Sequence, residues 1–205
     1  MKYTDAISLI KRYGIDFVEG SIVGSVDDAL KVAKYPVVLK VMSDEIIHKS
    51  DEGCVKLNVK DEDSLRKAYS EILSNAGKAK VEGVLVQRMA KPGSEIIIGG
   101  RRDEQFGPVI LFGLGGIFVE VFKDFSLRVC PIDGEDAMEM ITELKAYPLF
   151  KGVRGRKPVD IEAIADVLQK VSKLLYENER IKEMDINPVI VYEKGYCAVD
   201  VRVLP

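Results

Sequence analysis

The only histidine of the sequence, His48, lies in the polar stretch IIHKSDEGC. An imidazole can act as a nucleophile and carry a phosphoryl group on a ring nitrogen. Lys40 precedes it in the run VVLKVM, where strand alternation puts Val38 and Met42 on the face of the lysine. A lysine between apolar neighbours needs a partner, and phosphate is a suitable one. The ordinary alternatives are a surface histidine and an edge-strand lysine that reaches water.

A second group of polar residues occurs near the end of the chain, in the apolar runs MDINPVIV and AVDVRV. Strand alternation places Asp185, Asn187 and Val189 on one face. A tight turn at Glu193–Lys194 puts Asp200 opposite Asn187, and a turn one residue later puts it opposite Val189. Both registers bring the two aspartates and the asparagine to the same face.

Three oxygen-bearing side chains on one sheet face suit a hard cation such as Mg²⁺, with phosphate oxygens and water completing the coordination. The alternative is a solvated hairpin face, because Asp and Asn are commonly exposed. A merely solvated face in β-branched strands would more often carry Lys, Thr or Glu. The pattern therefore favours a magnesium site formed by Asp185, Asn187 and Asp200.

The glycine-rich stretch FGLGGIFVE, residues 112–120, has the spacing GxGG rather than GxGxxG, and no helical pattern follows it. A dinucleotide-binding loop is therefore a weak interpretation. Glycine turns between strands, or backbone amides close to a phosphate, fit better. Asp124 and Arg128 follow closely and are either a cross-strand pair or groups that face the phosphates.

Helical and β-branched segments alternate, which indicates an α/β or α+β fold. The helices are expected to start at Thr4, Ser25, Asp61 or Asp63, about Gly134, and Asp160, the last running to about Asn178. The expected strands are the runs VVLKVM, VKLNV, VLVQRM, EIIIGG, PVILFGLGG, FVEV and SLRVCPI and the terminal hairpin MDINPVIVY–YCAVDVRV. A single seam is expected near residues 89–93.

Composition excludes several classes of protein. The net charge is −3, and lysine and arginine are interspersed with acids, so no nucleic-acid-binding surface is indicated. The 3 cysteines are far apart and form no CxxC pair, which argues against a disulfide framework or zinc site. The most apolar run, residues 109–122, is too short for a membrane span and contains glycines and Glu120. We therefore expect a cytoplasmic protein with no membrane partner.

Three stretches together resemble a known family: YPVVLKVMSDEIIHKSDEGCVKL, GVLVQRMAKPGSEIIIGGRRDEQFGPVILFGLGGIFVE, and MDINPVIV with AVDV. They are similar, in order and over nearly the whole chain, to the β subunit of ADP-forming acetyl-CoA synthetases. This group belongs to the NDP-forming acyl-CoA synthetases, which are related to succinyl-CoA synthetase. The HKSD and FGPVI…FGxGGIxVE stretches are specific.

The resemblance implies a single ATP-grasp domain over residues 1–205, with a nucleotide held between a lobe of residues 21–88 and a lobe of residues 1–20 and 89–205. For the nucleotide, the resemblance assigns phosphate binding to Lys40, the adenine hinge to Gln87–Ala90 with Met89 inside it, and ribose binding to Glu95. It assigns Mg²⁺ binding to Asn187 and Asp200, with Asp185 as a weaker addition. His48 corresponds to the phosphorylated histidine, which the family carries on a mobile loop. Two positions depart from the family. Cys54 replaces a glycine of a GGV step, and Arg88 replaces a common glutamate.

The implied reaction forms acid, ATP and CoA from acyl-CoA, ADP and phosphate. His48 would take a phosphoryl group from a histidine of a partner and pass it to ADP·Mg²⁺. Since the chain shows no CoA-binding motif, a CoA-binding α subunit and a hetero-oligomer are expected. The alternatives are an ATP-grasp carboxylate ligase without phosphohistidine and a non-catalytic nucleotide-sensing subunit.

Overall fold

The computed structural model describes residues 1–43, 45–46, 52–115, 123–153 and 157–205. The chain divides into two compact units, one of Met1–Phe17 with Pro92–Pro205 and one of Val18–Lys91. Both boundaries lie three residues from the expected ones at 20/21 and 88/89. His48 and the expected strand FVEV, residues 118–121, lie outside the described residues.

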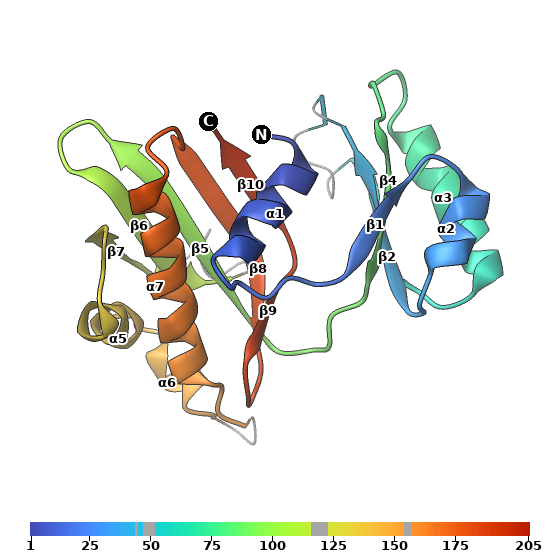
Figure 1. Ribbon diagram of the computed structural model, residues 1–205. Helices are drawn as coiled ribbons and strands as arrows, with labels where there is room; N and C mark the ends of the chain where they lie inside the picture. Colours follow the sequence, from blue (N-terminus) through green and yellow to red (C-terminus); the bar gives the residue numbers. More distant parts are fainter. Residues whose placement is uncertain (44, 47–51, 116–122, 154–156) are drawn as a thin grey trace. The chain divides into compact units, whose positions relative to one another are not determined.

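The unit Val18–Lys91 is an antiparallel sheet with two helices on one face (Figure 1). Its described strands have the order β1-β4-β2-β3 and are β1 (Gly20–Val23), β4 (Gly83–Arg88), β2 (Val37–Met42) and β3 (Val55–Val59). The helices are α2 (Val26–Val32) and α3 (Glu62–Asn75). The predicted cap at Ser25 is confirmed, since its side chain accepts a backbone N–H in the first turn of α2. Of the two predicted starts of the next helix, Asp61 and Asp63, the structure has Asp61, whose side chain caps α3 in the same way. The core fills the space between the helices and the inward residues of the strands.

The unit of Met1–Phe17 and Pro92–Pro205 contains a larger antiparallel sheet. Its described strands follow the order β10-β8-β5-β6-β7, and β9 pairs with β8 at the hairpin end. Their bounds are β5 (Ser94–Asp103), β6 (Gly107–Leu114), β7 (Phe125–Val129), β8 (Glu183–Val191), β9 (Tyr196–Ala198) and β10 (Val201–Leu204).

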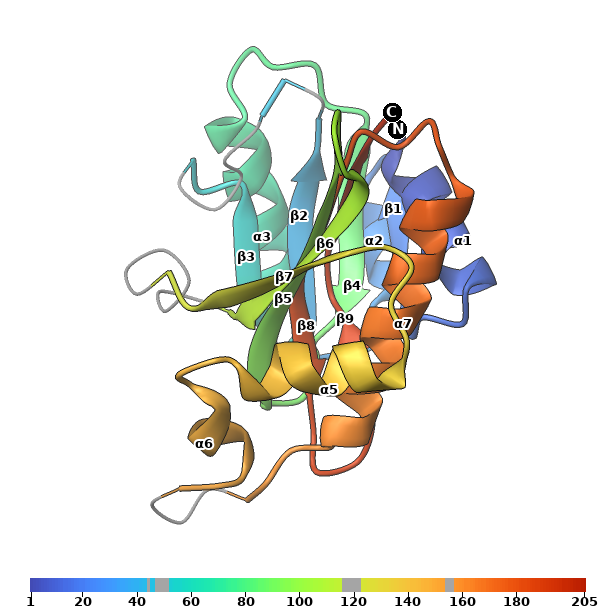
Figure 2. The same cartoon turned by 90° about the vertical axis from the view of Figure 1, so that its left-hand side faces the viewer.

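Helices cover one face of this larger sheet (Figures 1 and 2). They are α1 (Tyr3–Arg12), α5 (Gly134–Thr142) and α7 (Ile161–Glu177), and the short α6 (Tyr147–Phe150) follows α5. α7 packs on β5 and β6, α1 packs on β10, and α5 packs on α7 and β7. Their apolar residues form one core with the inward residues of the sheet. We call the opposite face the outer face.

The first helix starts earlier than predicted. α1 begins at Tyr3, and Lys2 is its N-cap residue without a side-chain cap. Thr4 therefore lies inside the helix, where its carbonyl accepts the hydroxyl of Ser8 at 2.8 Å. The prediction of a Thr4 cap was wrong because cap-forming residue types also occur within helices. None of the described helices is long and apolar enough to cross a membrane.

Candidate functional site

The terminal hairpin adopts the first of the two predicted registers. Its turn is Glu193–Lys194, because the Tyr192 N–H donates to the Gly195 carbonyl at 3.0 Å. The pairing of Ile186 with Val201 then places Asn187 opposite Asp200. The Asn187 N–H donates to the Asp200 carbonyl at 3.2 Å. Asn187 in β8 and Asp200, in the short segment between β9 and β10, are therefore directly opposite each other.

The alternation of inward and outward side chains along β8 shifts by one residue within the site. β5 pairs Ile96 with Val189 and Ile98 with Ile186, so the single residue between the two isoleucines faces two residues of β8. This is a β-bulge at Asn187–Pro188. Met184 and Ile186 face the core before the bulge, and Val189 and Val191 face it afterwards. The prediction that Val189 shares a face with Asn187 was therefore wrong, because a bulge shifts the alternation by one residue.

A hydrogen-bonded aspartate fixes the tip of the hairpin. The carboxylate of Asp160 accepts the N–H of Gly195 at 2.8 Å and the N–H of Ala163 at 3.0 Å, which caps α7. These two backbone donors, Gly195 first, lower the pKa of Asp160. The helix begins where it was predicted to begin, and its N-cap residue Asp160 also ties the hairpin to the helix that carries much of the core.

Asp185 lies two residues before Asn187 in β8, half-buried on the outer face. Burial raises the pKa of its carboxyl to about 6, and the negative charges of Asp200 and Glu183 add to the effect. Arg202, which pairs with Asp185 across the β8–β10 ladder, acts in the opposite direction. The two aspartates are thus close enough to repel each other, and a cation between them would remove that repulsion.

The oxygen donors at this site fit Mg²⁺, which prefers carboxylate and amide oxygens together with phosphate and water. Asp185 and Asn187 in β8 and Asp200 just before β10 would supply two carboxylates and one amide oxygen. Among the described residues, no group of three or more His, Cys, Asp or Glu side chains is placed to hold a metal ion, so Asn187 would have to complete this set.

Glu95 lies further along the same face. It is exposed on β5 and pairs with Ile190 of β8. Its neighbours Ile96 and Ile98 point into the core, so Glu95 is on the outer face with Asn187 and Asp185. Along β8 the order is therefore Glu95, then Asn187 with Asp200, then Asp185 with Arg202.

The other predicted binding residues lie in the unit Val18–Lys91. Val38 pairs with Gln87 and Lys40 pairs with Leu85, which places Lys40 and Gln87 on the same face of β2 and β4. Alternate residues of both strands belong to the core under the helices, so this face points away from α2 and α3. Lys40 is half-buried and Gln87 is fully buried.

The predicted hinge, Gln87–Ala90, consists of the last two residues of β4 and the two residues that follow it. Met89 and Ala90 are half-buried, and the Met89 N–H donates to the Pro36 carbonyl at 3.0 Å. Two residues depart from the family pattern. Cys54 is fully buried in the core of this unit, and Arg88 is exposed. His48 lies outside the described residues.

The described part of the glycine-rich stretch has a packing role. The Gly115 N–H donates to the Glu95 carbonyl at 2.8 Å. A Cβ at Gly115 would lie 3.0 Å from the backbone of Glu95, so glycine allows the two segments to approach. Residues 116–120 of the stretch lie outside the described residues.

Asp124 and Arg128 do not form the predicted cross-strand pair. The Asp124 carboxylate accepts the N–H of Lys145 at 3.0 Å and the N–H of Ala146 at 2.8 Å, just before α6. The Arg128 guanidinium pairs with Glu139 at 3.2 Å and with Glu143, both on α5. Both side chains are engaged in holding the α5–α6 region, because their polar atoms bond to it. Neither geometry supports the alternative that they face phosphates.

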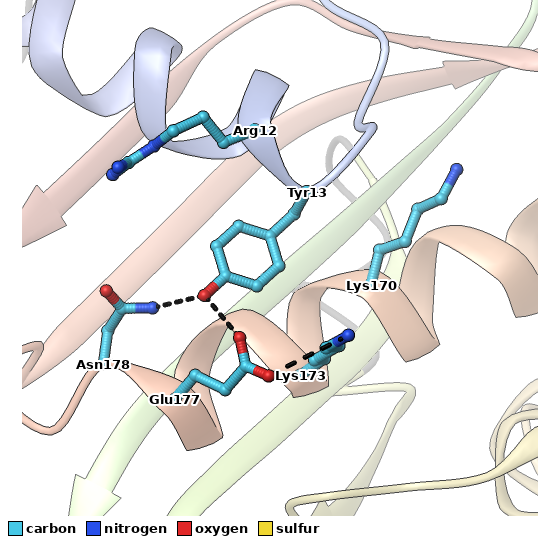
Figure 3. A pocket seen from close by; sticks show the side chains of 6 residues that line it. All are labelled: Arg12, Tyr13, Lys170, Lys173, Glu177 and Asn178. Carbon is cyan, nitrogen blue, oxygen red and sulfur yellow. Dashed lines mark hydrogen bonds and ion pairs between the residues drawn. The ribbon is translucent and has the colours of Figure 1, made fainter.

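A hollow of about 510 Å³ lies on the helical side of the same unit (Figure 3). The Tyr13 hydroxyl donates to Glu177 at 2.8 Å and accepts from the Asn178 amide at 2.9 Å. Lys170 donates to the Gly14 carbonyl at 2.8 Å, and its second partner is Asp166. Lys170 thus satisfies a carbonyl just beyond the end of α1, and the Tyr13 hydroxyl links that end to Glu177 and Asn178 at the end of α7. The hollow thus lies at the ends of α1 and α7, on the face of the sheet opposite to that of Asn187.

Comparisons with known proteins agree on one family. A family profile described as "ATP-grasp domain" matches residues 1–204. The chain is 48% identical over 207 residues to the acetate–CoA ligase (ADP-forming) I subunit beta of Pyrococcus furiosus, covering 98% of this chain and 89% of that protein. It is 50% identical to the acetate–CoA ligase (ADP-forming) I of Archaeoglobus fulgidus, covering 98% of this chain and 30% of that protein.

A solved structure is equally similar. Acetyl-coenzyme A synthetase 1 of Candidatus Korarchaeum cryptofilum, in complex with coenzyme A and Ca-AMPCP, has a TM-score of 0.96 and 47% identity and covers 100% of this chain and 92% of that chain. A second complex of that protein contains Mg-AMPPCP, and its phosphohistidine segment points towards the nucleotide-binding site. Nucleotide and Mg²⁺ use are therefore features of this family.

Proposed function

This chain belongs to the ATP-grasp domain family of the ADP-forming acyl-CoA synthetases, and on that premise we propose that it is their nucleotide-binding part, which transfers a phosphoryl group between a phosphohistidine and ADP. The observation that carries the proposal is the adjacency of Asn187 and Asp200 on the outer face, with Asp185 beside them. Such a donor set suits a hard cation and leaves coordination positions for phosphate oxygens.

Each side of the nucleotide has a proposed binding residue. Asn187 and Asp200 hold the cation that neutralises phosphate charge when it is bound, and Asp185 supports them. Glu95, further along the same face, accepts hydrogen bonds from the ribose hydroxyl groups. Lys40 donates to the phosphates, and Gln87–Ala90 contacts the adenine. The placement of Lys40 and Gln87 on one sheet face supports this division of roles.

His48 is proposed to carry the phosphoryl group. In the ATP-forming direction the N–P bond of phosphohistidine breaks, and a terminal oxygen of ADP forms the new P–O bond, so that the imidazole leaves neutral after taking up a proton. Phosphoryl transfer of this kind depends on positioning and charge neutralisation rather than on covalent help from further groups. A histidine carrier is useful where the donor and acceptor sites are far apart.

We also propose that the complete enzyme requires a CoA-binding partner. The Pyrococcus relative is named as a β subunit, whereas the Archaeoglobus relative is a longer protein of which the chain spans 30%. A hetero-oligomer with a CoA-binding α subunit fits this comparison. The expected outcome is that the purified chain alone does not turn over acyl-CoA, and full turnover by the chain alone would contradict the partner proposal.

Phosphorylation by labelled nucleotide tests the proposed function. The wild type and His48→Ala would be incubated with γ-labelled ATP and Mg²⁺, with and without the CoA-binding partner, and the chains separated before counting. We expect acid-labile, base-stable label on this chain that disappears in His48→Ala, while calorimetry shows unchanged ADP binding. The unchanged binding is the control, since it shows that the variant is folded.

Three other outcomes would contradict the proposal in distinct ways. Label on the partner alone would place the phosphohistidine there and leave His48 without a carrier role. Turnover without label in His48→Ala would indicate a carboxylate ligase that uses an acyl phosphate directly. Nucleotide binding without label or turnover, with the partner present, would indicate a nucleotide sensor.

A further inference from the structure

The outer face of the larger sheet carries an arginine beside the proposed cation ligands. Arg202 pairs with Asp185 across the β8–β10 ladder, next to the pair formed by Asn187 and Asp200. Val201 and Val203 on either side of it point into the core, so the side chain of Arg202 is on the outer face, where it is exposed. The hairpin register that places Asp200 opposite Asn187 also places Arg202 opposite Asp185, and this second pair follows from the sequence by the same count.

The order of residues along β8 gives a direction to a bound nucleotide. Glu95 marks the proposed ribose end, and Asn187 with Asp200 marks the cation between the phosphates. Asp185, the weaker of the proposed cation ligands, and Arg202 lie two residues further in the same direction, about 7 Å beyond Asn187 and Asp200. A chain of phosphates that starts at the ribose and passes the cation therefore ends near Arg202.

The charges at this end of the site call for a cation there. Asp185, Asp200 and Glu183 are all acidic and interact electrostatically, so an incoming phosphate meets three carboxyl groups. Among the described residues, Arg202 takes part in none of the ion pairs. Its planar guanidinium matches two phosphate oxygens at once, which a carboxylate-rich surface cannot do.

The floor of the site beside Asp185 is open. Gly99 of β5 pairs with Asp185 on the side away from Arg202. Its φ is not in the left-handed region, and a Cβ built there would meet its nearest atoms, those of Leu111 and Met184, at 3.7–3.9 Å. The glycine is thus required neither by backbone conformation nor by packing. It leaves the outer face free of a side chain where the end of the phosphate chain would lie.

We propose that Arg202 binds the terminal phosphoryl group of the nucleotide, the one that is transferred. The inference rests on the proposed function, because it takes its direction from the ribose and cation positions assigned there. The alternative role for Arg202 is to balance the negative charge of the neighbouring carboxylates without touching the nucleotide. The two roles differ in which ligand loses affinity when the arginine is removed.

Binding measurements on Arg202→Met and Arg202→Lys separate these roles. Calorimetry would give the affinity of each protein for ADP and for a non-hydrolysable ATP analogue, both with Mg²⁺, and for Mg²⁺ alone. We expect Arg202→Met to weaken binding of the ATP analogue by about tenfold to a hundredfold, the range for a lost charge-assisted hydrogen bond. ADP, which lacks the terminal phosphoryl group, should lose much less, and Mg²⁺ alone should bind equally well or more tightly.

Arg202→Lys should recover part of the affinity for the ATP analogue, since it restores the charge but not the planar fork. Arg180→Met is the matched control, because Arg180 is exposed in the turn between α7 and β8, and it should bind all three ligands as the wild type does. Equal losses for ADP and the ATP analogue, no loss for either, or weaker binding of Mg²⁺ alone would each overturn the proposal. A wild type that binds no nucleotide would overturn the proposed function as well, whereas wild-type binding with an unaffected Arg202→Met would overturn this inference alone.

Discussion

Replacing Asp185 by asparagine should stabilise the metal-free protein near neutral pH. Burial raises the pKa of the Asp185 carboxyl from 3.8 to about 6. A group with a raised carboxyl pKa binds its proton more tightly in the folded than in the unfolded state. The contribution of Asp185 to the free energy of unfolding is therefore fully favourable below about pH 4, is lost as the pH rises from about 4 to 6, and stays lost above pH 6.

The size of the effect follows from the shift. Each pKa unit corresponds to about 1.4 kcal/mol, so a shift from 3.8 to about 6 corresponds to about 3 kcal/mol at pH 7. Asparagine has nearly the same shape and carries no charge to desolvate. Asp185→Asn should therefore be more stable than the wild type by about 2–3 kcal/mol at pH 7 and by much less at pH 4.

The measurement is urea denaturation of both proteins between pH 4 and pH 8 in the presence of a chelator. Glu183→Gln is the control, since Glu183 is exposed on the same strand and its loss should change the unfolding free energy by less than about 0.5 kcal/mol. Adding Mg²⁺ should stabilise the wild type more than Asp185→Asn, because the cation favours the carboxylate. Equal stabilities of the two proteins at pH 7, with the same pH dependence, would refute the reasoning.

Two further predictions concern the packing that supports the site, both measured by urea denaturation. Gly93→Ala should lower the free energy of unfolding by about 1–3 kcal/mol, because the new Cβ would lie 2.7 Å from the Val191 carbonyl oxygen. The control is Gly24→Ala, whose new Cβ would have no atom within 4 Å and should leave the free energy of unfolding unchanged. Ser172→Ala should cost about 1–3 kcal/mol, because its hydroxyl accepts the buried Ile132 N–H at 2.9 Å. Faster hydrogen exchange at Ile132 would identify the lost bond, and unchanged stability of either variant would contradict its prediction.

The secondary structure was largely predictable where a local signal coincides with tertiary packing. Ser25, Asp61 and Asp160 each precede an amphipathic run, and each caps the helix that follows. The hairpin register was predictable to within two choices, since a tight turn was expected around Lys194. The structure selects the turn that leaves Gly195 after it, where φ is +75 and glycine is favoured.

The partners of long side chains could not be predicted from spacing. Arg128 lies four residues after Asp124, which suggested either a cross-strand pair or two groups facing phosphates. Both instead bond to groups that follow them by eleven residues or more. Local spacing says nothing about where α5 and α6 pack, because that depends on the burial of their apolar faces in the common core.

The bulge at Asn187–Pro188 explains how one strand serves both the core and the site. Without it, Asn187 and Val189 would face the same way, so that either the amide would be buried or the valine exposed. With it, Met184, Ile186, Val189 and Val191 all reach the core while Asp185 stays on the outer face. Proline is confined within sheets to edges, strand starts and bulges, so Pro188 in the middle of an apolar run carried the signal for this phase change. The sequence MDINPVIV therefore encodes two half-strands of opposite phase, and the polar half is the one that the candidate cation site requires.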